Sequence, residues 1–219
     1  MLSISEIFVS LEGEGIEMGL RKVFLRLAGC NLKCSYCDTD YREKFTLSAV
    51  KAAKKIRALA ERENICHLSI TGGEPLLQAE VLNEIIPELR RRFQISLETN
   101  GTLACAMKSL EPVDFVSCDI KIPSASGVPC WKETEEFIQV LRKRRIPFQL
   151  KAVVDKTSTR KEVIRAARLA GDVIILQPVF KKRYSEKEFS HFDSLCSAAS
   201  AFVREARFLP QMHKYLGIR

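Results

Sequence analysis

Residues 67–101, HLSITGGEPLLQAEVLNEIIPELRRRFQISLETNG, decide the fold class. The apolar spacing predicts a strand at 67–70, a helix at 78–93 that Pro87 kinks, and a second strand at 95–98. A strand, a helix and a strand in this order pair their strands in parallel through a right-handed crossover. The stretch therefore predicts one unit of an α/β fold.

The same alternation extends in both directions along the chain. A strand is predicted at 23–27, and a helix at 47–62 carries Val50, Ala53, Ile56 and Leu59 or Ala60 on its apolar face. The later elements are strands at 115–120, 148–154 and 173–176 and helices at 133–145, 160–170 (which Gly171 ends) and 189–207. Six strands separated mostly by helices predict an α/β domain with parallel strands, either a doubly wound sheet or a partial barrel.

Composition and charge narrow the class of protein. The chain of 219 residues has no repeat and no Pro/Gly-rich linker, so a single domain over 1–219 is predicted. It lacks an apolar run of about 20 residues and a secretory signal, so we expect a cytoplasmic protein with no membrane partner. The net charge of +8 would attract phosphates, nucleic acid or an acidic protein. The basic runs carry no interleaved aromatic residues, and no nucleic acid partner is expected.

Polar side chains follow almost every predicted strand. The carboxyl ends of parallel strands meet at one edge of the sheet, where such folds place their chemistry. These side chains therefore predict a site for a polar ligand at that edge. They are Arg26, Thr71 to Glu74, Glu98 to Asn100, Asp119, Lys121, Lys151 and Gln177.

Three of the eight cysteines are clustered, in the run CNLKCSYC at 30–37. Three thiolates in one short loop can hold a four-iron, four-sulfur cluster that leaves one iron open to a ligand. A structural zinc site needs four ligands, and Cys66, His67 or Cys118 would have to complete it. The spacing favours the cluster, with zinc or three unrelated cysteines as the alternatives.

The cysteine spacing, CxxxCxxC followed by Asp38-Thr39, resembles the cluster loop of the radical S-adenosylmethionine (SAM) enzymes. Residues 71–75 (TGGEP) resemble the glycine-rich segment that holds the methionyl amino group in that superfamily. The resemblance implies that the open iron chelates SAM. Reductive cleavage of a C–S bond of SAM then gives a 5′-deoxyadenosyl radical.

Further motifs resemble the 7-carboxy-7-deazaguanine synthase family. They are SLEGEG at 10–15, FLRLAGCNL at 24–32, CDT at 37–39, ETNG at 98–101 and PQMHKYLG at 210–217. The resemblance implies a carbon–nitrogen lyase of queuosine and deazapurine biosynthesis, which contracts 6-carboxy-5,6,7,8-tetrahydropterin to 7-carboxy-7-deazaguanine with loss of ammonia. It also implies a shortened, modified partial (β/α)6 radical SAM barrel, one 4Fe-4S cluster per chain on three cysteines, SAM, Mg²⁺ and a homodimer.

The same resemblance implies roles for individual residues. Substrate contacts would come from Leu11, Glu12, Gly13, Arg26, Thr71, His213 and Arg219. SAM contacts would come from Tyr36, Cys37, Asp38, Gly73, Glu74, Asp119, Ile120, Lys121, Leu176, Gln177 and Pro178. The cluster ligands would be Cys30, Cys34 and Cys37, and Thr39 would bind Mg²⁺. No side chain is expected to act as a nucleophile.

The charges of two predicted substrate residues, Arg26 and Glu12, bear directly on substrate recognition. Arg26 would clamp the substrate carboxylate, with an ion-paired strand residue as the alternative interpretation. The family commonly has glutamine where this chain has Glu12. An ionised carboxylate only accepts hydrogen bonds, so its charge beside a substrate carboxylate requires compensation by Mg²⁺, Arg26 or protonation.

Two other functions stand as alternatives. A radical SAM activase that forms a glycyl radical on a partner protein would need an open groove for a peptide. A nucleic-acid-binding protein with structural zinc would be colourless and would bind RNA in a salt-dependent way. For the synthase, the basic charge favours an acidic flavodoxin or ferredoxin as electron donor, with docking that depends on ionic strength.

Overall fold

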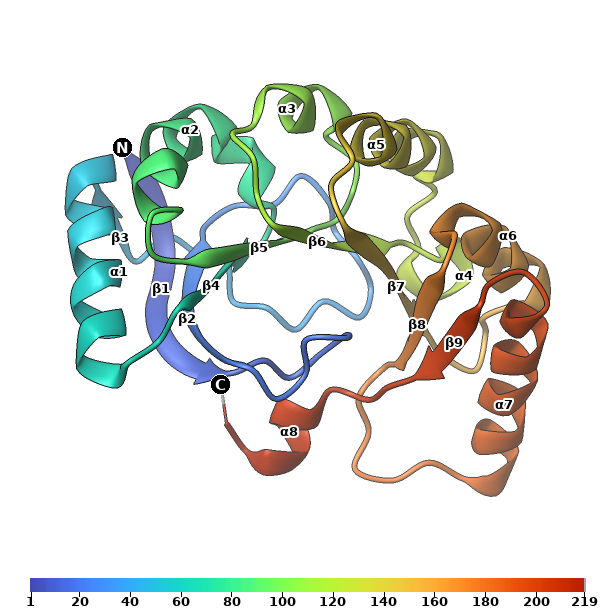
Figure 1. Ribbon diagram of the computed structural model, residues 1–219. Coiled ribbons are helices and arrows are strands. Elements are labelled where there is room, and N and C mark those ends of the chain that lie inside the picture. The colour runs from blue at the N-terminus through green and yellow to red at the C-terminus, as the bar shows by residue number, and fades with distance from the viewer. Residues whose placement is uncertain (219) are drawn as a thin grey trace.

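One curved sheet of nine strands forms the frame of the molecule (Figure 1). The computed structural model describes residues 1–218, so Arg219, a predicted substrate residue, lies outside the described residues. The strand order is β3-β1-β2-β4-β5-β6-β7-β8-β9. The strands are β1 (Leu2–Leu11), β2 (Arg21–Leu27), β3 (Phe45–Leu47), β4 (His67–Gly72), β5 (Gln94–Thr99), β6 (Phe115–Ile120), β7 (Phe148–Val154), β8 (Val173–Pro178) and β9 (Glu205–Phe208).

Helices cover the convex outer side of this sheet, and one short helix lies at the mouth of the concave side (Figure 1). The outer helices are α1 (Ala49–Glu63), α2 (Ala79–Leu89), α3 (Ala104–Ser109), α5 (Trp131–Arg144), α6 (Arg160–Ala170) and α7 (Glu186–Ser200). Three short helices lie nearer the site: η1 (Pro75–Gln78), α4 (Pro123–Ser126) and α8 (Met212–Leu216). The outer face of the sheet therefore packs against long helices, whereas the inner face is left mostly uncovered by helices.

The polarity of the sheet follows this division, because side chains alternate between the two faces of a strand. In β2, Val23 and Leu25 are fully buried in the core, whereas Lys22, Phe24 and Arg26 face inward. The inward residues of the next strands are mostly polar as well. They are Ser69 and Thr71, Ser96 and Glu98, Ser117 and Asp119, Gln149 and Lys151, and Gln177.

The predicted parallel core is confirmed. The six expected strands are β2 and β4 to β8, which lie side by side and pair in parallel. The order ends at β3 and β9, as in a partial barrel. Helix α6 has the predicted bounds, and Gly171, with φ of 85°, ends it.

Three details differ from the sequence-based prediction. Strand β1 was not predicted, and it pairs antiparallel with β2 and β3. Residues 205–207, expected in the last long helix, lie in β9, because α7 ends at Ser200 and Glu205 pairs with Val173. The helix expected at 78–93 is shorter: Gln78 ends η1, α2 begins at Ala79, and α2 ends at Leu89, two residues after Pro87.

The apolar face of α1 also differs from the prediction. Val50 is 73% exposed, and the buried stripe runs through Ala49, Ala52, Ala53, Ile56 and Ala60. Val50 follows Ala49 by one residue, which rotates it about 100° away from this stripe. The helix packs closely because its core face is built mainly from alanine.

Among the helices of residues 1–218, none has both the length and the apolar character needed to cross a membrane.

Candidate active site

Two adjoining cavities lie on the inner side of the sheet, at the carboxyl ends of its parallel strands. The first has a volume of about 410 Å³ and the second about 330 Å³. They share seven lining residues, so they form one continuous site. The shared residues are Glu14, Asp38, Thr39, Thr71, Glu98, Gln211 and Lys214.

The cysteine loop forms one wall of the first cavity. Cys30, Cys34 and Cys37 all line it, and the loop follows directly from the carboxyl end of β2. Ser35 fixes the middle of the loop, since its backbone N–H donates to the Ser126 carbonyl at 3.0 Å and its hydroxyl donates to the Ala125 carbonyl at 2.5 Å. The loop therefore reaches from β2 across to α4.

The donor set fits an iron–sulfur cluster. Within residues 1–218, no three His, Cys, Asp or Glu side chains converge as a single metal ion would require. Thiolates that bind different irons of one cluster need not converge on one point. Burial raises the pKa of the Cys34 thiol, and a metal centre would hold that thiol as the thiolate.

The alternative zinc ligands lie elsewhere. Cys66 and His67 are neighbours, with Sγ 3.4 Å from Nδ1, at the amino end of β4. The cysteine loop lies at the opposite end of these parallel strands, several residues of about 3.3 Å each away. Cys118 is buried in β6 against Gly101. The alternative in which Cys66 or His67 completes a zinc site with this loop is therefore excluded by their position.

Three buried polar atoms at the first cavity lack hydrogen-bond partners among residues 1–218: Tyr36 Oη, Asp119 Oδ1 and Gln177 Oε1. Burial raises the pKa of Tyr36, so the phenol stays protonated and can donate. Buried polar groups nearly always find partners. These atoms therefore fit a polar ligand such as SAM, and all three residues were predicted to contact it.

Glu74 does not turn toward either cavity. Its side chain is fully buried and accepts hydrogen bonds from Leu76 N at 3.0 Å, Thr99 Oγ1 at 2.8 Å and Asn100 N at 2.7 Å. Burial raises the pKa of Glu74, against these hydrogen bonds. The carboxylate thus ties the glycine-rich segment to the end of β5, while Gly73 lines the first cavity.

Three other predicted SAM residues face the opposite side of their strands. Ile120 and Leu176 belong to the apolar core, and Pro178 lies on the same side of β8 as Leu176. Asp119, Lys121 and Gln177 alternate with them and do line the first cavity. Tyr36, Cys37 and Asp38 line it as well.

A chain of alternating charges crosses the floor of the site. Lys121 Nζ lies 2.8 Å from Asp119 Oδ2, and Lys151 Nζ lies 3.5 Å from Asp119 Oδ1. Lys151 also pairs with Glu14, which accepts from Gln211 Nε2 at 2.7 Å. Burial opposes ionisation of Glu14, but Lys151 and Gln211 outweigh it and lower the pKa to about 2. The site therefore holds fixed charges of both signs.

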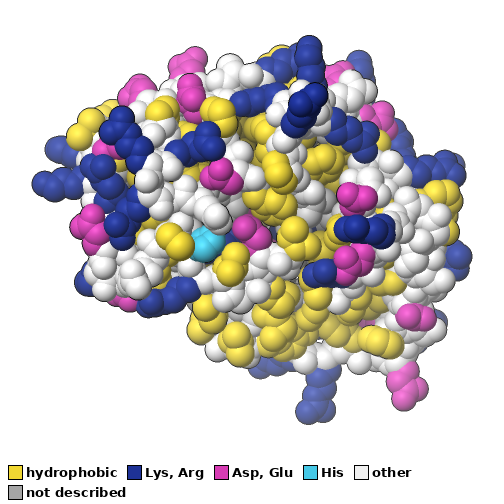
Figure 2. All heavy atoms as spheres, in the orientation of Figure 1, with side chains coloured by type: hydrophobic (Ala, Val, Ile, Leu, Met, Phe, Trp, Pro, Cys, Tyr) yellow, Lys and Arg dark blue, Asp and Glu magenta, His cyan; other side chains and the backbone are white. Residues whose placement is uncertain are grey.

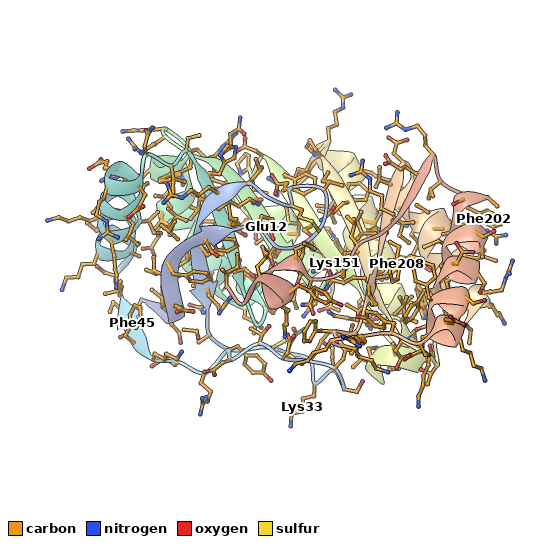
Figure 3. All side chains as sticks on the ribbon, turned by 90° about the horizontal axis from the view of Figure 1, so that it is seen from below. Glu12, Lys33, Phe45, Lys151, Phe202 and Phe208 are labelled. Carbon is orange, nitrogen blue, oxygen red and sulfur yellow. The ribbon has the colours of Figure 1, made fainter. Side chains whose placement is uncertain are left out.

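Glu14, Glu98, Lys151 and Gln211 were not predicted to contact substrate, SAM or a metal. Lys151 and Glu98 had been noted at strand ends, and Gln211 in the tail motif, so a signal for each existed. Glu98 lines both cavities and accepts from Ser69 Oγ at 2.8 Å and Thr71 Oγ1 at 3.0 Å. Figure 3 shows Lys151 and Glu12 in the middle of the molecule and Lys33, of the cysteine loop, at its edge.

The C-terminal tail closes one side of the site. Met212 N donates to Gly13 O at 3.0 Å, and a Cβ on Gly13 would fall 2.2 Å from the ring Nδ1 of His213. Lys214 pairs with Asp38 next to the cysteine loop. Burial lowers the pKa of His213, which favours its neutral form at the second cavity.

The second cavity gathers the described substrate residues that were predicted. It is lined by Leu11, Glu12, Gly13, Arg26, Thr71 and His213, and Thr39 lies where it joins the first. Arg26 Nη1 lies 3.1 Å from Glu6 Oε2, and its guanidinium stacks 4.9 Å from the centre of the Phe8 ring. Arg26 is thus an ion-paired strand residue that also borders the cavity.

A curved parallel sheet with a three-cysteine loop at its carboxyl edge defines a radical SAM protein, and residues 25–170 match the radical SAM superfamily. Two similar chains are 7-carboxy-7-deazaguanine synthases. The one from Archaeoglobus fulgidus is 34% identical over 99% of both chains, and the one from Geobacter sulfurreducens is 32% identical over 98% of this chain and 96% of its own. The chain belongs to the 7-carboxy-7-deazaguanine synthase family, and it is an enzyme.

Solved structures support the fold. QueE from Escherichia coli has a TM-score of 0.63 and 22% identity over 97% of this chain and 94% of its own. TYW1 with a bound lysine–pyruvate adduct has a TM-score of 0.60 and 14% identity over 83% of this chain and 74% of its own. The modified radical SAM fold expected from the sequence is therefore confirmed.

Proposed function

We propose that this chain catalyses the reaction of its family, the ring contraction of 6-carboxy-5,6,7,8-tetrahydropterin to 7-carboxy-7-deazaguanine and ammonia, in queuosine and deazapurine biosynthesis. The atoms balance without a net oxidant, so SAM can be regenerated. The observation that carries the proposal is the continuity of the two cavities, which join the cysteine loop to a pocket that the tail closes. One cavity suits SAM and the other a small polar substrate.

The first cavity suits a 4Fe-4S cluster on Cys30, Cys34 and Cys37 with SAM beside it. When bound, this pair supplies the 5′-deoxyadenosyl radical that takes a hydrogen atom from the substrate. The chain itself would bind and orient SAM through Gln177 Oε1, which has no hydrogen-bond partner among residues 1–218, and through Asp119 Oδ1, whose nearest cation is Lys151 Nζ at 3.5 Å. Lys121 orients Asp119, since its ammonium lies 2.8 Å from Oδ2.

The second cavity suits the pterin. Arg26 can pair with the substrate carboxylate in exchange for Glu6, in the bidentate geometry that favours arginine. The Thr39 hydroxyl lies at the junction of the cavities and would supply one protein oxygen to Mg²⁺, with substrate and water as the other ligands. Removing Mg²⁺ would then raise the KM for the pterin.

The closed tail favours this small substrate over a protein glycine. Helix α8 and Gln211 form part of the cavity walls through contacts to Glu14, Gly13 and Asp38. A peptide would have to displace these contacts to reach the cysteine loop. The radical activase is therefore the second candidate. The match to radical SAM enzymes argues against a zinc-stabilised nucleic-acid-binding protein.

The partners are part of the proposal. We infer a homodimer, which the family resemblance implies, and, because the net charge is +8, an acidic flavodoxin or ferredoxin as electron donor. Lys and Arg side chains spread around the periphery of the face in Figure 2. Reduction by such a donor should slow as ionic strength rises. A rate independent of salt would contradict the docking, and a monomer by light scattering would contradict the dimer.

The decisive experiment is an anaerobic assay with iron-loaded enzyme, a reductant, SAM, Mg²⁺ and the carboxytetrahydropterin. We expect a pyrrole-fused product with the mass and absorbance of 7-carboxy-7-deazaguanine and one ammonia per turnover. Iron-loaded enzyme that cleaves SAM but leaves the pterin unchanged would overturn the proposed substrate. Brown protein with about four irons per chain is the expected starting material.

A further inference from the structure

Lys22 is a fully buried cation beside the second cavity. It lies on the inner face of β2, and its side chain is 1% exposed. Its ammonium donates to Glu12 Oε2 at 3.0 Å, Glu17 Oε2 at 2.7 Å and Ser96 Oγ at 3.1 Å. Three acceptors match the three protons of an ammonium, which is the arrangement that makes a buried charge tolerable. Lys22 itself lines neither cavity.

Glu12 connects this cation to the cavity. One carboxylate oxygen accepts from Lys22, the other accepts from Glu14 N at 3.2 Å, and the side chain lines the second cavity. Burial and the charge of Glu98 raise the pKa of Glu12 to about 8, and Lys22 opposes that shift. With this raised pKa much of Glu12 carries a proton at neutral pH, and Lys22 is the group that keeps the ionised form, in which both oxygens are acceptors, within reach.

We propose that Lys22 is a positioning residue for substrate recognition: it orients Glu12 and stabilises the ionised form of that carboxyl as an acceptor for a neighbouring pair of N–H donors on the substrate. The proposal rests on the proposed function, because the 2-amino-4-oxopyrimidine ring of a pterin carries two neighbouring N–H donors on one edge. Glu98 borders the same cavity, so Lys22 also offsets one of two carboxylates that would repel each other. Glu17 shares the ammonium from outside both cavities.

Hydrogen-bond directions give the proposal a sharp signature. In Glu12→Gln, the amide oxygen would turn to Lys22 and its NH₂ group would face the substrate's own donors, which weakens binding. In Lys22→Met, Glu12 would lose the cation that opposes its raised pKa, so the carboxyl would stay protonated and lose an acceptor. In the double variant Glu12→Gln/Lys22→Met, the amide is free to turn its oxygen toward the substrate.

The test compares iron-loaded enzymes in the anaerobic pterin assay, with KM and kcat measured separately. Each single variant should raise the KM for the pterin about tenfold or more, the scale of a lost hydrogen bond to a charged group. The double variant should recover most of that loss, which no purely structural role of Lys22 predicts. Glu17→Gln is the matched control: it removes an ion pair of Lys22 and should keep KM within about twofold.

The outcomes separate this inference from the proposed function. A wild-type enzyme that leaves the pterin unchanged overturns the function. If the wild type is active, an unchanged KM in Glu12→Gln overturns the inference even if Lys22→Met fails to fold. A double variant that folds, binds iron and is no better than Glu12→Gln also overturns it. Raised KM values in the single variants with rescue in the double variant support it.

Discussion

The carbonyl oxygen of Gly29 occupies the space where a side chain on Gly73 would begin: a Cβ on Gly73 would fall 2.1 Å from that oxygen. The N–H of Glu74 donates to the same carbonyl at 2.9 Å. The glycine-rich segment after β4 and the start of the cysteine loop are therefore in direct backbone contact. The backbone of Gly73 is not in the left-handed region, so the position requires space and not an unusual conformation.

This contact predicts that Gly73→Ala displaces the cysteine loop. Contacts to backbone atoms below 3 Å force a shift, and a displacement of about 1 Å at a reacting centre can cost on the order of a hundredfold in rate. We expect reductive SAM cleavage to fall at least about tenfold, with less iron bound per chain. Gly19→Ala controls for general destabilisation without a clash at the cysteine loop: a Cβ on Gly19 meets nothing within 4 Å, and its φ of 89° strains an alanine there through the backbone alone. Wild-type iron and cleavage in Gly73→Ala would contradict the argument.

The parallel core could be predicted from the sequence because its strands and helices alternate locally. Strand β1 could not, since it pairs through a hairpin that lacks a helical crossover. Alternation along β6 and β8 also explains why Asp119 and Gln177 reach the cavity, while Ile120 and Leu176, carried over with them as runs, do not.

Long-range contacts limited the prediction of the site. The hydrogen bond from Gln211 to Glu14 joins residues 197 positions apart, and no local pattern indicates it. The orientation of Glu74 depends on Thr99 and Asn100 of another strand. Residue types at strand ends therefore indicated where chemistry occurs, but not which side chains are already paired.

The cysteine assignment predicts that Cys34→Ala loses the brown colour, most of the iron and turnover. The loop has three thiols, and all three are needed as protein ligands of the cluster. Without Cys34, only two ligands remain, which are too few to retain it. Cys66→Ala and Cys105→Ala are matched controls, since both thiols are exposed and neither lines the cavities. Iron and absorbance spectra of anaerobic protein check the prediction, and retained turnover in Cys34→Ala would refute it.

The Lys151–Glu14–Gln211 contacts predict an acid-sensitive attachment of the tail. The folded pKa of Glu14, about 2, lies below its ordinary value of 4.5, so the stabilisation is complete above pH 4.5 and is lost as pH falls toward 2. The full shift corresponds to roughly 3 kcal/mol at neutral pH. The difference in free energy of unfolding between wild type and Glu14→Gln should therefore shrink between pH 6 and pH 3. Urea titrations measure it, and a difference constant with pH would show that Glu14 is not held by these partners.

The buried carboxylate of Glu74 predicts a support role that can be separated from direct SAM binding. Its oxygens accept three hydrogen bonds, and glutamine would present an NH₂ group to at least one of these donors. We expect Glu74→Gln to lower the free energy of unfolding by about 1–3 kcal/mol, the scale of an unsatisfied buried group.

Thr99→Val is the matched variant for Glu74→Gln, because it removes one of the same hydrogen bonds, Thr99 Oγ1 to Glu74 at 2.8 Å, and leaves the carboxylate in place. We expect it to destabilise the protein less and in the same direction. Urea unfolding and SAM affinity by isothermal titration should be measured on both variants. If Glu74→Gln keeps wild-type stability but loses SAM affinity, the Glu74 carboxylate contacts the SAM ammonium directly. Its side chain would then turn away from Thr99 and Asn100 when SAM binds.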